Sequence, residues 1–217
     1  MKYLYKYPQT AYPYDDLVRT NAKRTRFDPE YELIDTGVFD TNRYFDVFVE
    51  YCKETPEDIL IRITAVNREE LPATLYLLPH LWFRNTWTDL QGNEKPQLRR
   101  LYGRRSCCVG ASHPKPGTIY WHFETDRKLL FTDNETNTQR IFGRPNDSPY
   151  VKDACHQYVI DGKAECINGA NAGTKCAACC NVEVPAKGEF VMKSSCRASS
   201  AALMPSFSSS SARCSPG

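Results

Sequence analysis

The feature that most constrains this chain is a series of short apolar segments in which large side chains recur at every second position. In the clearest segment, residues 59–66, Ile61 and Ile63 fall on one face while Arg62 and Thr64 fall on the other. A period of two is typical of a half-buried β-strand. Because such segments recur along most of the chain with turn residues between them, the sequence predicts an all-β, antiparallel β-sandwich.

Most of the predicted elements are therefore strands. We expect them at residues 31–39, 43–51, 59–66, 74–83, 118–124, 128–132, 157–160, 181–184 and 188–193. Pro79 cannot donate to a ladder, so an edge, a bulge or a bend is expected there. The segment 15–24 is predicted to be a short helix, because its acids lie in the first turn and its bases in the last.

The last 24 residues differ in composition from the rest of the chain. Residues 194–217 hold ten serines and show no hydrophobic period. Such a segment cannot bury enough apolar surface to order itself. We therefore expect a single domain over residues 1–193, a strand that stops at Ser194, and a disordered tail over 194–217.

Charge and hydropathy exclude several classes of protein. The chain of 217 residues has 28 basic and 26 acidic side chains, a balance of +2, so nucleic-acid binding is not expected. No apolar run reaches 18 residues, so no membrane span is predicted. The first residues do not resemble a signal peptide, so we expect a cytoplasmic protein whose ten cysteines are reduced.

The cysteines nevertheless offer one candidate metal site. Cys176, Cys179 and Cys180, together with His156, could supply soft ligands to zinc. A second C-x-x-C motif or a spaced histidine pair is missing, so unpaired thiols in a loop are the favoured interpretation. We predict no cofactor. The basic cluster 99–105 is likewise interpreted as a solvated loop, with a phosphate or acidic partner as the alternative.

Several blocks of the sequence resemble a known family. They are Tyr5–Val18, Asp28–Asp40, Arg43–Val47, Leu78–Trp87 and Lys152–His156. Together these blocks resemble the N-terminal domain of bacterial-type glycoside hydrolase family 63 proteins, relatives of mannosyl-oligosaccharide glucosidase. The resemblance covers roughly residues 1–193.

The resemblance implies a two-part enzyme of which this chain is one part. Family members look like a β-sandwich (a supersandwich) followed by a barrel of paired α-helices. That barrel carries both catalytic carboxylates and hydrolyses α-glycosidic bonds with inversion. By this resemblance the chain is an incomplete, non-catalytic sandwich fragment, and its partners are the missing barrel and the oligosaccharide of the parental enzyme.

The acidic residues agree with a non-catalytic role. An inverting glycosidase needs two carboxyl groups across the scissile bond, one of them with a pKa raised by apolar surroundings. No acid in this chain lies within an apolar run. Asp46, between Phe45 and Val47, comes nearest, and strand alternation is expected to point it to solvent. We therefore predict no catalytic residue here.

A sugar contact is the most specific binding site that the residues indicate. Trp82, Arg84, Asn85 and Trp87 lie close together in the sequence. Aromatic rings stack on sugar faces, and Arg and Asn bind hydroxyl groups. Packing within the sandwich or against the barrel is the favoured alternative. A self-standing carbohydrate-binding or protein-interaction module is the alternative function, since the fold cannot decide between them.

Overall fold

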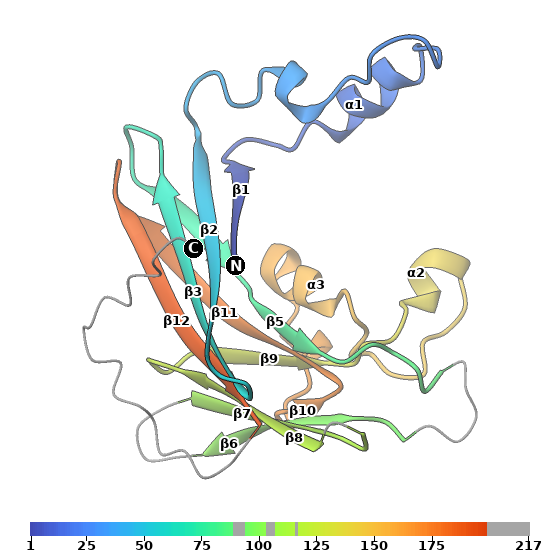
Figure 1. The fold of residues 1–217 in the computed structure, drawn as a ribbon. Coiled ribbons are helices and arrows are strands. Elements are labelled where there is room, and N and C mark those ends of the chain that lie inside the picture. The colour runs from blue at the N-terminus through green and yellow to red at the C-terminus, as the bar shows by residue number, and fades with distance from the viewer. Residues whose placement is uncertain (89–93, 103–106, 116, 199–217) are drawn as a thin grey trace. The chain divides into compact units, whose positions relative to one another are not determined.

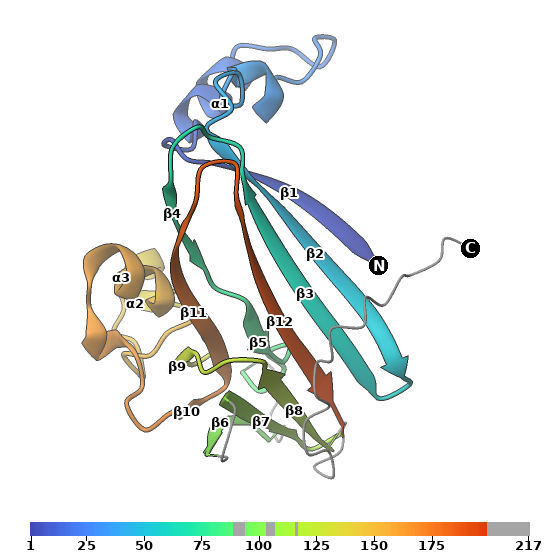
Figure 2. The same ribbon diagram turned by 90° about the vertical axis from the view of Figure 1, so that its left-hand side faces the viewer.

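The computed structural model describes residues 1–88, 94–102, 107–115 and 117–198. Within these residues the chain forms two antiparallel sheets and a few short helices, so the predicted all-β, sandwich-like class is confirmed (Figures 1 and 2). The strands are β1 (Lys2–Pro8), β2 (Tyr44–Thr55), β3 (Asp58–Asn67), β4 (Ala73–Leu77), β5 (His80–Trp82), β6 (Gln97–Tyr102), β7 (Cys107–His113), β8 (Gly117–Phe123), β9 (Lys128–Thr132), β10 (Ala172–Gly173), β11 (Lys175–Val184) and β12 (Glu189–Arg197). The helices are α1 (Tyr14–Asn21), α2 (Thr138–Phe142), α3 (Ala154–Asp161) and the 3-10 turns η1 (Leu33–Thr36) and η2 (Ala164–Cys166).

The chain divides into two compact units. Unit 1 comprises residues 1–52, 61–76 and 181–192, and unit 2 comprises 53–60, 77–180 and 193–217. Strands β2, β3, β4, β11 and β12 contribute residues to both.

Unit 1 contains the strand order β1-β2-β3-β12, with β4 beside β11. Strand β1 pairs antiparallel with β2, from Lys2 opposite Glu50 to Pro8 opposite Tyr44. Helix α1 and turn η1 form an arm beyond the ends of these two strands (Figure 1). The core is small and is closed by Phe45, Ala65, Leu75, Val184 and Met192.

Unit 2 contains the strand order β12-β8-β7-β6-β10, and β11 pairs with β5 and β9. The β7–β8 hairpin returns at Gly117, whose φ of 80° lies in the left-handed region that favours glycine. Gly173 is required for a different reason, because a Cβ there would lie 2.3 Å from the carbonyl oxygen of Thr132. The core is made of Leu98, Val109, Trp121, Phe123, Leu130, Phe131 and several cysteines.

Pro79 interrupts the strand predicted over 74–83. The structure splits this segment into β4 and β5, and the carbonyl of Pro79 accepts a bond from the Ala178 amide at 3.0 Å. The predicted bend is confirmed. The predicted helix at 15–24 is also present, although it begins one residue earlier and ends at Asn21.

Two strand predictions are wrong. Residues 31–39 contain the 3-10 turn η1 (Leu33–Thr36) in place of a strand, because Glu32 and Asp35 make a reciprocal capping box and Gly37 ends the turn at a φ of 71°. Residues 157–160 belong to α3, whose Ala154 and Cys155 are buried and which ends at Gly162 with a φ of 68°. In both segments capping and turn chemistry outweigh a short β-branched or aromatic run.

The expected boundary at Ser194 is also wrong. Strand β12 continues to Arg197, where it pairs with β8 from Ser194 opposite Phe123 to Arg197 opposite Tyr120. Ser194 and Ser195 are buried. Serine is small enough for a sheet interior, and the ladder satisfies its backbone groups. The rest of the predicted tail, residues 199–217, lies outside the described residues. Strand β1 was not predicted at all.

Candidate functional site

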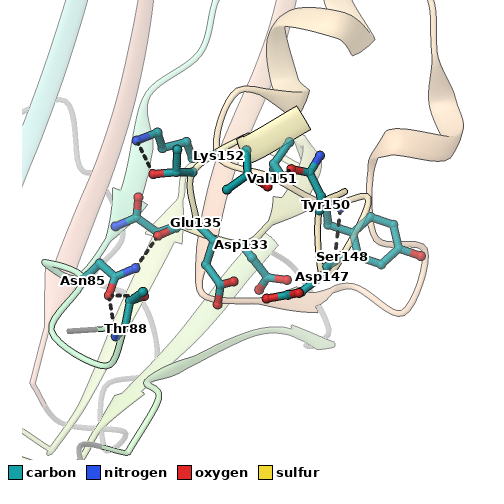
Figure 3. A pocket seen from close by; sticks show the side chains of 13 residues that line it. Asn85, Thr88, Asp133, Glu135, Asp147, Ser148, Tyr150, Val151 and Lys152 are labelled. Carbon is teal, nitrogen blue, oxygen red and sulfur yellow. Dashed lines mark hydrogen bonds between the residues drawn. The ribbon is translucent and has the colours of Figure 1, made fainter. Parts of the chain in front are cut away.

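Unit 2 holds a polar pocket of about 320 Å³ built by three stretches of chain (Figure 3). One stretch follows β5, a second follows β9, and the third precedes α3. Carboxylates, amides and hydroxyls dominate the lining. The lining residues are Asn85, Thr88, Asp133, Asn134, Glu135, Thr136, Thr138, Asn146, Asp147, Ser148, Tyr150, Val151 and Lys152.

The first wall of the pocket depends on Gly173, which lets its own backbone approach that of Thr132 closely. The next residue, Thr174, donates its amide to the Thr132 carbonyl at 3.1 Å and to the Asp133 carboxylate at 3.2 Å. The Thr174 hydroxyl accepts the Asn134 amide at 2.7 Å. The buried end of β9 thus fixes the backbone from which Asp133 and Asn134 project.

Two asparagines tie the stretch after β5 to this wall. The Asn134 side chain donates to the Phe83 carbonyl at 3.0 Å, and the Asn85 side chain donates to the Asn134 carbonyl at 2.9 Å. The side-chain oxygen of Asn85 also accepts hydrogen bonds from the backbone amide and the hydroxyl of Thr88. Both amide side chains are therefore held in fixed orientations.

The opposite wall depends on Asn137, which is buried. Its side-chain oxygen caps α2 by accepting the Arg140 amide at 3.0 Å, and it also accepts a bond from Asn146 at 3.1 Å. Its side-chain nitrogen donates to Asp153. Asn146 in turn accepts the Thr138 hydroxyl at 2.9 Å. A buried polar network of this kind rigidifies the loop that carries Asp147 and Ser148.

The charges at the pocket are mixed. Glu135 accepts the indole N–H of Trp87 at 3.3 Å and pairs with Lys95. Lys152 donates its ammonium to the Thr136 hydroxyl at 3.2 Å. Within the described residues the exposed Asp147 carboxylate has no hydrogen-bond or ion-pair partner. Alternating donors and acceptors on a fixed backbone suit a ligand rich in hydroxyl groups.

The four predicted sugar-contact residues do not converge. Asn85 lines the pocket. Trp87 does not, but its indole N–H donates to Glu135, which is a lining residue. Trp82 is half exposed on β5, where the Lys175 ammonium lies 4.8 Å from its ring centre. Arg84 is exposed and lines a separate cavity of about 300 Å³ beside Phe83 and His113.

Sequence reasoning missed most of the pocket. Of the lining residues, the sequence analysis singled out only Asn85 and, within the block Lys152–His156, Lys152. The available signal was the run of hydrogen-bonding side chains that follows the buried strand β9, since such residues commonly shape loops through side-chain to backbone bonds.

The zinc alternative is not supported by the geometry. Among the described residues, no group of three or more His, Cys, Asp or Glu side chains comes together to hold a metal. Cys176 and Cys180 share one face of β11, and Cys179 lies on the other, as strand alternation requires. His156 is exposed on α3.

The prediction that these thiols lie in a loop is wrong, because Cys176, Cys179 and Cys180 lie in strand β11. The cysteines of unit 2 behave as apolar core residues instead. Burial raises the pKa of Cys108 to about 11 and that of Cys196 to about 12, and it raises the pKa of Cys176 well above its ordinary value. Protonated, buried thiols are poor nucleophiles and poor ligands. None of the nine described cysteines forms a disulfide bond.

Asp46 is the one acid whose predicted orientation is wrong. It is 5% exposed and accepts hydrogen bonds from Lys6 at 2.9 Å and Arg68 at 2.7 Å. Burial alone would raise the pKa of this carboxyl, but the bonds from the two cations hold it below its ordinary value. The pKa of Glu50 is likewise lowered, by bonds from Arg62 and Lys2 that outweigh burial. Such carboxylates stay ionised, unlike the acid of a glycosidase pair.

The basic cluster 99–105 was predicted to be a solvated loop, and this is wrong for its described part, because residues 99–102 belong to strand β6. Arg100 pairs with Asp126 at 3.1 Å, and Arg104 and Arg105 lie outside the described residues. In the part of the chain that the structure describes, no helix is long and apolar enough to cross a membrane.

Comparison with known proteins gives one informative similarity. No family model matches the chain. The chain is 35% identical over 225 aligned residues to the uncharacterized protein YMR196W of Saccharomyces cerevisiae. The alignment covers 88% of this chain and 21% of the yeast protein, so the chain spans about a fifth of the length of this relative.

Proposed function

We propose that the chain is the non-catalytic β-sandwich part of a longer, α-glucosidase-like glycoside hydrolase, in which it supports a separate catalytic barrel. The observation that carries the proposal is the pocket of unit 2. Two of the blocks that resemble family 63, Leu78–Trp87 and Lys152–His156, are far apart in the sequence. They meet at this pocket through Asn85 and Lys152.

The chemistry of the pocket supports an oligosaccharide as its ligand. The side chains of Asn85 and Asn134 are fixed by hydrogen bonds to the backbone. The Asp147 carboxylate is exposed and can accept hydrogen bonds from the hydroxyl groups of a sugar. Fixed polar groups of this kind orient a ligand at low entropic cost. A cytoplasmic location is part of the proposal and is supported by the lack of disulfide bonds among the described cysteines.

A hydrolysis assay tests whether catalysis belongs to the longer protein and not to this chain. We expect the isolated chain to leave α-linked gluco-oligosaccharides intact. We expect the longer yeast relative to release glucose with inversion, which NMR detects as the initial anomer of the product. Hydrolysis by the isolated chain, or no hydrolysis by the yeast protein, contradicts the proposal.

A binding assay tests the pocket. Because a ligand that binds only the native state raises the melting temperature, oligosaccharides of α-linked glucose and mannose should stabilise the chain if the pocket binds them. The variant Asp147→Asn should lose most of that shift. Asp161→Asn is the matched control, since Asp161 lies in the same unit at the end of α3. A strong shift in the isolated chain, together with no hydrolysis by the longer yeast protein, favours the self-standing carbohydrate-binding module.

A further inference from the structure

Strand β1 is the edge of its sheet within the described residues (Figure 2). Met1 and Tyr51 exchange two hydrogen bonds, at 3.0 Å and 2.8 Å, and the Gln9 amide donates to Arg43 at 2.8 Å. Backbone groups in an antiparallel pair face the partner at every second residue. The odd-numbered residues of β1 therefore bond to β2, and the even-numbered residues face away.

The outward side of β1 is an open ladder edge. In the described part of the chain, no strand pairs with the outward-facing backbone N–H and C=O groups of Lys2, Leu4 and Lys6. The Leu4 side chain is 53% exposed. A row of free donors and acceptors is a template for pairing with another strand.

One face of this edge carries a row of tyrosines. Tyr3, Tyr5 and Tyr7 are 55%, 54% and 45% exposed, and the rings of Tyr5 and Tyr7 lie 6.4 Å apart. Burial and then the neighbouring Tyr12, Tyr14 and Tyr7 raise the pKa of Tyr5, so these hydroxyls gather at one place. Rigid amphipathic rings supply contact area at low entropic cost.

The other face of β1 is basic. Lys2 is 61% exposed and 3.4 Å from Glu50, while Lys6 is bound more closely to Asp46. A strand added to this edge places alternate side chains over the tyrosines and over the lysines. A second copy is disfavoured, because antiparallel pairing of two β1 strands around Leu4 sets Lys2 opposite the Lys6 of the other copy.

We propose that β1 is a docking edge for an extended polypeptide strand whose side chains alternate between apolar and acidic. The apolar side chains lie over Tyr3, Tyr5 and Tyr7, and the acidic ones lie over Lys2 and Lys6. Main-chain bonds supply affinity and the alternation supplies specificity. This inference goes beyond the proposed function and involves no sugar.

Amide hydrogen exchange tests the edge directly. The probe is a synthetic peptide, Thr-Val-Glu-Val-Thr-Val-Glu, which in antiparallel pairing sets its valines over the tyrosines and its glutamates over Lys6 and Lys2. Its control has the same composition with the valines adjacent. In the free chain we expect slow exchange at Tyr3, Tyr5 and Tyr7 and fast exchange at Lys2, Leu4 and Lys6. The alternating peptide should slow the second set at least tenfold, and the control peptide should not.

A matched pair of variants tests the backbone contact. Leu4→Pro removes an outward N–H and leaves the bonds to β2 in place, so it should weaken peptide binding at least tenfold. Leu4→Ala keeps that N–H and should bind nearly as well as the parent chain. Continued protection of Tyr5 shows that β1 is still folded. If Leu4→Pro disturbs β1, the parent chain with a peptide N-methylated along one edge replaces it, and the expected loss is the same.

Several outcomes overturn the proposal. They are equal binding of both peptides, binding without protection of Leu4, and protection of Leu4 without peptide in a chain of doubled mass, which indicates a second copy. Protection by maltoheptaose in place of the peptide indicates a glycan surface. None of these outcomes bears on hydrolysis or on the pocket of unit 2, so the proposed function is judged separately.

Discussion

The two units differ in their cysteine content, because eight of the nine described cysteines lie in unit 2 and only Cys52 lies in unit 1. Unit 1 places polar groups between its strands. Asn67 is fully buried, and its side chain bonds to the backbone of Leu71, Val184 and Pro185. Asp46 is buried between two cations. A small core of this kind depends on satisfied polar partners.

Unit 2 buries polar side chains too, and it also fills part of its interior with thiols. Eight of its described cysteines have a pKa raised chiefly by burial. Cys176, the second residue of β11, is fully buried. A thiol in these positions acts as a small hydrophobic side chain. The comparison teaches that an unusual cysteine content can reflect packing and need not reflect chemistry.

The largest effect is expected from Asn67→Ala in unit 1. This change leaves buried carbonyls and the Glu69 amide without their partner, which should cost about 3 kcal/mol of unfolding free energy. Urea denaturation measures it. The control is Asn181→Ala, an exposed asparagine bonded to Tyr76, which should change stability by about 0.5 kcal/mol or less. Equal effects of the two variants contradict the role of the polar network.

The next largest effect on unfolding free energy is expected at Cys176 in unit 2, where alanine and serine variants are compared. Cys176→Ala should cost about 1 kcal/mol by opening a small cavity. Cys176→Ser should cost a further 1–3 kcal/mol or so, because its hydroxyl has no partner in this apolar site. Denaturant midpoints measure the order. A serine variant as stable as the alanine variant shows that this position is not an apolar site.

A pH dependence distinguishes unit 1. The pKa of Asp46 is lower in the folded chain than in the unfolded chain, so its contribution to stability is present above the unfolded pKa. That contribution is lost as the pH falls through the folded pKa, below about 4. Asp46→Asn should therefore be less stable than the parent chain at pH 6, and the difference should shrink in acid. A difference that is independent of pH contradicts the ion pairs.

The smallest effect is expected from metal removal. Since the described thiols of unit 2 form no metal-binding group, a chelator should leave the melting temperature unchanged within error. Calorimetry with and without a zinc chelator measures this. A fall in the melting temperature that added zinc restores indicates that the thiols bind a metal.

The sequence predicted those elements whose pattern is local and strong. The period of two over 59–66 lies within β3, and Pro79 separates β4 from β5 as expected. Where a pattern was short, local chemistry decided otherwise: Glu32 and Asp35 cap a 3-10 turn, and residues 157–160 are helical. Of the predicted sugar contacts, only Asn85 lines the pocket.

By itself the sequence determined the all-β class, because alternation of side chains along a strand is a local property. It also determined the balanced charge. Only the tertiary structure decided which polar residues are buried, since Asp46 is buried where Lys6 of β1 and Arg68, the residue after β3, both pair with it. The same holds for the pocket of unit 2, because its walls are joined by a hydrogen bond between Asn85 and Asn134, which are 49 residues apart.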